Sequence, residues 1–337
     1  MTSTTFSSPA RAPRILRLAA TAVLAQLLLA GAAHAVPVID AGNALIFGNF
    51  TSKNSSSQGA LIVGGDTWVT GYGVNSQNAN PYGIIGAGDV KLNNSGVTGS
   101  VWAGGAVKQA GSGVSGGTNA MAASDVNWAL YGAYYDHLSN TYGSMANTGT
   151  TNLQWGTLNL TATSAAATAV FTITADQILN ASSFSFSGLA AGQNLVLNVL
   201  GSSVSFANKD LNTSLGAYST ILNFVDAVSV SFNSIDVSAS ILATDAKITG
   251  ANGSVKGMVV AKEWDAQIAL KYNNQTAMRL KSEADMLAAL NPPQPVNRVP
   301  EPGSLALVGL ALTALGVSRS KTLRSFFRLA HPTLQFA

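Results

Sequence analysis

Short apolar runs that stop at small residues recur along the first part of the chain. Three of them align with one another, at Ile62–Asp66 (IVGGD), Ile84–Asp89 (IIGAGD) and Val101–Ala106 (VWAGGA). They recur about every 17 to 22 residues, and a second short strand pattern follows each run. This loose repeat predicts the stacked coils of a β-solenoid, in which the strands of successive coils pair. Hairpins in a β-sandwich are the alternative, because the turn spacing permits them too.

The same strand pattern returns in the second half of the chain. Six segments there are rich in β-branched residues and bounded by Gly, Asn, Asp or Ser: Ala169–Leu179, Ser183–Leu189, Asn194–Phe206, Ser219–Asn233, Ala239–Gly250 and Gly253–Trp264. Gly and Asn at such boundaries supply the positive-φ corners at which a chain turns. Alternating polar and apolar residues are typical of strands with one buried face. We therefore predict a mainly β fold, a β-helix-like solenoid with one or two packed α-helices.

Two segments have helical rather than strand periodicity. In residues 122–146, Ser124 is a candidate N-cap. Apolar residues then recur at i, i+4, i+8 and i+12 on one face: Val126, Leu130, Tyr134 and Leu138. A second helix is expected over residues 278–290, ended by Asn291-Pro292, because proline cannot continue a helix.

The first helix also carries an aromatic cluster with two interpretations. Its members are Trp128, Tyr131, Tyr134 and Tyr135. They could form a sugar-stacking surface, but packing of an amphipathic helix onto the sheet is the preferred interpretation.

The N-terminal 35 residues have the organisation of a secretory signal peptide. Arg11, Arg14 and Arg17 precede the apolar run 18–32, and small residues at Ala33 and Ala35 flank the predicted signal peptidase cut. An uncleaved membrane anchor is the alternative. Export across the inner membrane is the expected consequence.

A short apolar stretch, Leu305–Val317, lies near the other end of the chain. A straight bilayer crossing takes about 20 residues, so this stretch predicts a marginal single transmembrane helix. The basic residues Arg319, Lys321 and Arg324 follow it and are expected to hold the C-terminus in the cytoplasm. Residues 291–298 (NPPQPVNR) precede it as a stiff proline-rich spacer.

This ending resembles the PEP-CTERM sorting signal of Gram-negative bacteria. The match rests on residues 299–328: Val299, Pro300, Glu301 and Pro302, the apolar stretch, then Arg319, Lys321 and Arg324. The resemblance implies recognition and removal of the tail by the protease exosortase, and an association with exopolysaccharide and biofilm. A plain C-terminal anchor is the alternative, and the tail 329–337 is longer than is usual for such signals.

The net charge of the body differs in sign from that of the whole chain. The whole chain carries +3, but seven of its 18 basic residues and only one of its 15 acidic residues lie in the two ends. The remaining body is therefore about −3, with scattered charges, and shows no nucleic-acid footprint. Cysteine is absent, so disulfides and thiol chemistry are excluded.

The body, which we assign to residues 36–290, resembles the choice-of-anchor A domain of bacterial surface proteins. The motifs that carry the match lie within about residues 43–273: Phe47–Thr51, Val63–Asp66, Asn198–Gly201, Ile241–Ala246 and Gly253–Gly257 leading into Val260-Ala261. The family usually has a Pro-Asn pair where this chain has Thr244-Asp245. The resemblance implies a mostly β, helix-like fold with an adhesive role, and it provides no catalytic residues to carry over.

Few residues of the body suggest chemistry. His137 is the one histidine outside the two ends, which excludes a multi-histidine zinc site. Glu263 and Asp265 are a possible carboxylate pair for glycosidic chemistry. Asp66 and Asp89 follow Gly-rich runs, either as calcium ligands or, preferably, as residues that cap corners.

We therefore expect a non-enzymatic surface or matrix protein without metal or cofactor. Its partners would be the two processing proteases, the membrane before processing, and an exopolysaccharide or other surface ligand. The alternative is a polysaccharide-active enzyme of the envelope that uses carboxylates. Ice binding by a flat Thr-rich face comes third, because the threonines are not regularly spaced.

Overall fold

The computed structural model describes residue 39 and residues 42–209, 211–272 and 278–292. The chain divides into two units, residues 1–290 and 291–337. The helices and strands of the described residues all lie in the first unit. The signal peptide, the sorting signal, the tail and all but two residues of the spacer lie outside the described residues.

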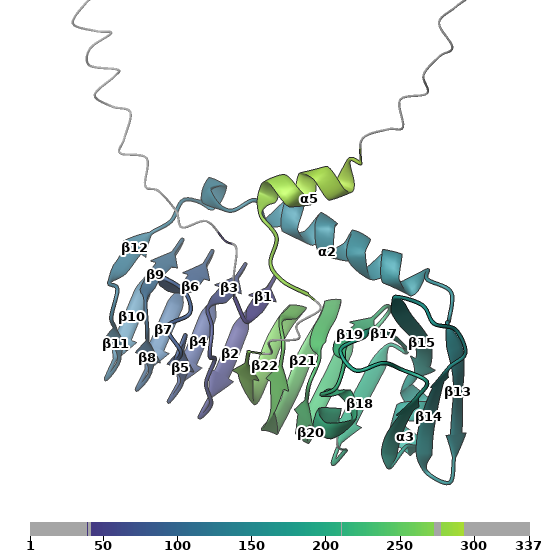
Figure 1. The fold of residues 1–337 in the computed structure, drawn as a ribbon. Coiled ribbons are helices and arrows are strands. Elements are labelled where there is room, and N and C mark those ends of the chain that lie inside the picture. The colour runs from purple at the N-terminus through teal and green to yellow at the C-terminus, as the bar shows by residue number, and fades with distance from the viewer. Residues whose placement is uncertain (1–38, 40–41, 210, 273–277, 293–337) are drawn as a thin grey trace, which may run out of the picture. The chain divides into compact units, whose positions relative to one another are not determined.

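The first half of the domain consists of short strands in coils of two or three (Figure 1). They are β1 (Ala44–Ile46), β2 (Phe50–Lys53), β3 (Leu61–Val63), β4 (Thr67–Thr70), β5 (Gly73–Val74), β6 (Tyr82–Gly86), β7 (Val90–Asn93), β8 (Gly96–Val97), β9 (Ser100–Ala103), β10 (Val107–Ala110), β11 (Gly113–Val114) and β12 (Thr118–Ala120). A 3-10 turn, η1 (Ala123–Asp125), and the helix α2 (Trp128–Gly143) follow.

The second half has longer strands and short helices. They are β13 (Gly149–Gln154), β14 (Thr157–Ala162), β15 (Thr168–Thr174), α3 (Ala175–Asn180), β16 (Ser183–Ser187), β17 (Asn194–Leu200), β18 (Ser203–Ala207), α4 (Leu211–Leu215), β19 (Ser219–Phe224), β20 (Ser229–Val237), β21 (Ser240–Lys256), β22 (Val259–Lys271) and α5 (Glu283–Leu290). The hairpin β13–β14 was not expected from the sequence, and the predicted strand 169–179 ends as helix α3.

Apart from the antiparallel hairpin β13–β14, the paired strands stack in parallel register, which confirms the β-solenoid and rules out the sandwich of hairpins. One face, which we call the covered face, has the order β12-β9-β6-β3-β1-β22-β21-β19-β17-β15. A second, the open face, has the order β10-β7-β4-β2-β22-β21-β20-β18. The long strands β21 and β22 take part in both faces. A coil of the first half takes 17 or 23 residues, which is the sequence spacing between the successive register partners Ala44, Leu61, Ile84 and Val101.

The stacking order is not the sequence order. The first strand, β1, pairs with the last, β22, through Ala44 and Val259, and not with an end of the stack. The strands of the first half therefore stack from β1, in the middle of the solenoid, toward β12 at one end. The strands of the second half begin at the other end, with β15, and stack back toward β1. The purple strands beside the green strands in Figure 1 mark this contact.

One corner of the coils has the left-handed backbone conformation throughout the domain. Five of its residues directly follow an open-face strand, and two lie within the long strands β20 and β21. They are Asn54, Gly71, Asn94, Gly111 and Asn208, then Ser234 and Asn252, all with φ between 46° and 60°. Asn and Gly adopt this conformation at the least cost, which explains their recurrence there. The prediction that these residues supply the positive-φ corners is confirmed.

Apolar side chains fill the inside of the coils, and the largest fully buried one is Trp264. The corner before the open face is so tight that a Cβ on Gly64 would lie 2.3 Å from the Phe47 carbonyl oxygen of the neighbouring coil. Only glycine fits at such an approach.

A second apolar cluster lies outside the coils, where α2 and the segment 278–290 pack on the covered face. The N-cap of α2 is Asn127, whose side chain accepts from the Leu130 N–H, so the prediction of Ser124 was wrong. Ser124 instead lies in η1. The second helix ends at Leu290 as predicted but begins only at Glu283. Among the residues that the structure describes, no helix is long and apolar enough to cross a membrane.

Candidate binding face

The open face presents a row of outward side chains that runs across both halves of the chain. Each member is the register partner of the next: Ser205, Ser231, Thr249, Asp265, Thr51, Trp68, Lys91 and Lys108. Two residues further along the strands, a parallel row of the first half holds Lys53, Thr70, Asn93 and Ala110. We call these positions the outward rows.

Strand alternation fixes which residues face outward. In β4, Thr67 and Val69 are buried while Trp68 and Thr70 are exposed. In β7, Val90 and Leu92 are buried while Lys91 and Asn93 are exposed. Because successive side chains of a strand point to opposite faces, the buried set fixes the direction of the exposed set.

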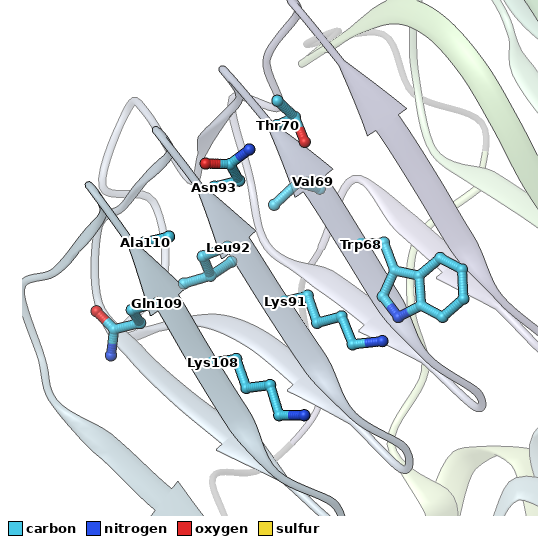
Figure 2. A pocket seen from close by; sticks show the side chains of 9 residues that line it. All are labelled: Trp68, Val69, Thr70, Lys91, Leu92, Asn93, Lys108, Gln109 and Ala110. Carbon is cyan, nitrogen blue, oxygen red and sulfur yellow. The ribbon is translucent and has the colours of Figure 1, made fainter.

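Trp68 is the large exposed aromatic residue of this face, with 44% of its surface accessible. The Lys91 Nζ lies over its ring, 4.3 Å from the centroid, which is cation–π geometry. Figure 2 shows Trp68, Lys91 and Lys108 side by side on neighbouring strands. They line a shallow depression of about 400 Å³ with Asn93 and Gln109.

A second depression of about 330 Å³ lies on the other side of Trp68, over β2 and β22. Thr51, Lys53, Asp265 and Gln267 line it, together with Trp68. Asp265 makes an ion pair of 3.0 Å with Lys247, and both side chains are about half exposed. The negative charge of Asp265 is therefore largely compensated within the face.

A comparison with protein-family models gives one match, which covers residues 43–272. The family is described as "putative ice-binding-like adhesive domain". The chain belongs to this family. Membership in an adhesive domain family indicates a surface or extracellular protein with an adhesive role. No curated protein and no solved structure is significantly similar to the chain.

The aspartates at the corners of the adhesive domain cap the backbone. Asn49 Oδ1 accepts from the Asp66 N–H at 2.9 Å, and Asp66 Oδ1 from the Asp89 N–H at 2.8 Å. Asp89 Oδ1 in turn accepts from the Ala106 N–H at 2.9 Å. These side chains therefore form a ladder from coil to coil, as the corner interpretation predicts. The described part of the chain contains no group of three or more His, Asp or Glu placed to hold a metal.

The aromatic residues of α2 are packing residues. Tyr131 and Tyr135 are almost fully buried and Tyr134 is 9% exposed. Burial raises the pKa of Tyr135, and its hydroxyl donates to the Arg279 carbonyl at 3.2 Å. The preferred interpretation of this cluster is confirmed. His137 is exposed on the same helix, and its carbonyl accepts from the Thr141 hydroxyl.

The carboxylates proposed for glycosidic chemistry are not gathered in one hollow. Asp265 is exposed and paired with Lys247, and the depression that it lines does not include Glu263. Glu263 is half-buried, close to the corner at Gly48. The aromatic residue missed by sequence reasoning is Trp68, whose signal was its outward position in the alternating segment TWVT.

Proposed function

We propose that the protein is an exported, non-enzymatic adhesin that attaches to polysaccharide at the surface or in the extracellular matrix of a Gram-negative bacterium. In this proposal it is made with a signal peptide and is processed at its C-terminus by exosortase. It then takes part in building a biofilm.

The observation that carries the proposal is the open face. One row of it continues through eight strands, from Ser205 to Lys108, whereas α2 and the segment 278–290 pack their apolar residues on the covered face. The row offers hydroxyl, ammonium and carboxylate groups with one exposed indole. A long chain of sugar units can contact many of these groups at once, and repeated weak contacts add up to firm attachment.

The two ends of the chain support the location. Residues 1–35 have the organisation of a signal peptide, and residues 299–328 resemble a PEP-CTERM signal. Their functional residues in this proposal are Ala33 and Ala35 for the first cut, and Val299–Pro302 with Arg319, Lys321 and Arg324 for sorting.

Two measurements test the proposal. Mass spectrometry of the protein from fractionated cells should find it outside the cytoplasm, without residues 1–35 and without the segment after the Pro-Glu-Pro motif. A deletion strain should form less biofilm, and the purified protein should bind extracted exopolysaccharide. Normal biofilm together with no binding contradicts the proposal, as does an intact chain in the cytosol.

A further inference from the structure

We propose that the part of the open face around Trp68 is a binding site for an acidic polysaccharide, one whose sugar units carry carboxylates. The site consists of Trp68, Lys91 and Lys108, with Lys53 across the second depression. This inference rests on the proposed function and names its ligand class.

The charged side chains on the strands of this part of the face are all positive. The strands β2, β4, β7 and β10 carry Lys53, Lys91 and Lys108 and no acidic residue. Within the described residues none of the three lysines makes an ion pair, whereas the neighbouring Asp265 is paired with Lys247. The unpaired ammonium groups attract an anion, although the body as a whole is negative.

The geometry suits a chain molecule better than a single small anion. Neighbouring strands lie about 4.8 Å apart, so Lys91 and Lys108 repeat along the row at about that distance. An extended chain of pyranose units advances by a similar length per unit, so successive carboxylates can meet successive strands. Both depressions are open to solvent and border Trp68, so a chain can pass over both of them and extend beyond them.

Trp68 adds selectivity for a sugar. It lines both depressions, so a chain that crosses from one to the other must contact the indole. The apolar C–H face of a pyranose packs on an aromatic ring, and the ammonium of Lys91 already lies within cation–π distance of this ring. A carboxylate on the bound sugar would reach Lys91 while its ring contacts Trp68.

The test measures binding of the full-length protein to polygalacturonate, to the same polymer with its carboxylates reduced to alcohols, to neutral dextran and to double-stranded DNA. We expect polygalacturonate to bind best, and added salt to weaken it because screening reduces the attraction between charges. W68A and the double variant K91Q/K108Q should each weaken binding to polygalacturonate about tenfold or more.

Matched controls separate the site from general charge and hydrophobicity. W155A removes the other highly exposed tryptophan, and K262Q/K281Q removes two exposed lysines outside the outward rows. Both should bind like the wild type. Because Lys108 is exposed, K108E tests the site in a protein whose packing is unchanged, and it should bind more weakly than K108Q.

Three results would overturn the inference. These are equal binding of the carboxyl-reduced polymer, tighter binding of DNA than of polygalacturonate, and equal losses in the control variants and the site variants. If the protein binds extracted exopolysaccharide and W68A and K108E leave that binding unchanged, the site is wrong while the proposed function stands. If no polysaccharide binds at all, the inference is wrong, and normal biofilm in the deletion strain would then contradict the proposed function as well.

Discussion

The rings of Phe50 and Trp264 are stacked and nearly parallel, with centroids 5.9 Å apart and an interplanar angle of 4°. The two residues are register partners on β2 and β22, so the stack joins the beginning of the domain to its end. Phe50 also meets Tyr72 edge-on at 6.0 Å. The interior of the solenoid is therefore continuous across the contact between the two halves of the chain.

The first prediction concerns this contact. W264A should lower the free energy of unfolding by about 3–5 kcal/mol, because a fully buried aromatic side chain leaves a cavity that the stacked strands fill only in part. Urea unfolding followed by circular dichroism measures this change. The control is W68A, which removes a half-exposed indole and should cost much less. Similar losses in the two variants would contradict the continuous interior.

The second prediction concerns the polar contact between α2 and the covered face. Asn223 Nδ2 donates to Asn198 Oδ1 at 2.8 Å and to the Ser139 carbonyl at 3.0 Å, and Ser139 Oγ donates to Asn223 Oδ1 at 2.7 Å. Asn198 also donates to the Tyr142 carbonyl. N223A should lower the free energy of unfolding by about 1–3 kcal/mol, since it leaves buried polar groups unpaired.

Thermal and urea unfolding measure the effect of N223A. N233A provides the control, because Asn233 is an exposed asparagine on β20 of the open face. It should stay close to the wild type, as most surface substitutions do. If N223A were as stable as N233A, the polar contact would not hold the helix in place.

The third prediction concerns the turn of the β13–β14 hairpin. Trp155 is 96% exposed and has φ of +48°, and Gly156 follows with φ of +76°. These are the signs of a type I′ turn, whose first position favours asparagine. W155N should therefore raise the free energy of unfolding by about 1 kcal/mol, whereas W155A should bring little gain, because alanine has no such preference for positive φ. Urea unfolding of the two variants decides between them, and a W155N variant less stable than W155A would contradict the prediction.

The sequence was a good guide to what repeats within each coil, but not to the contacts between distant segments. The apolar runs and the Asn and Gly corners predicted parallel coils, because each coil needs left-handed corner residues and these lie close in sequence to the strands that they connect. The pairing of Ala44 with Val259 could not be predicted, since a repeat implies that coils stack in sequence order. The register that places Thr51, Trp68 and Lys91 side by side also depends on coil lengths that differ along the chain. For this reason the outward rows became visible only in the structure.

The last prediction concerns the corner ladder of Asn49, Asp66 and Asp89. D66A should lower the free energy of unfolding by about 1–2 kcal/mol, because the Asp89 N–H loses the side-chain oxygen that accepts from it at 2.8 Å. D66N should stay close to the wild type, since an amide oxygen accepts the same bond, as Asn49 already does from the Asp66 N–H. The measurement is thermal unfolding of both variants with calcium and with a chelator. A capping role requires that D66N is much more stable than D66A and that calcium changes neither. A calcium role would reverse this pattern: D66N would resemble D66A, and calcium would stabilise only the wild type, because a neutral amide binds the ion more weakly than a carboxylate.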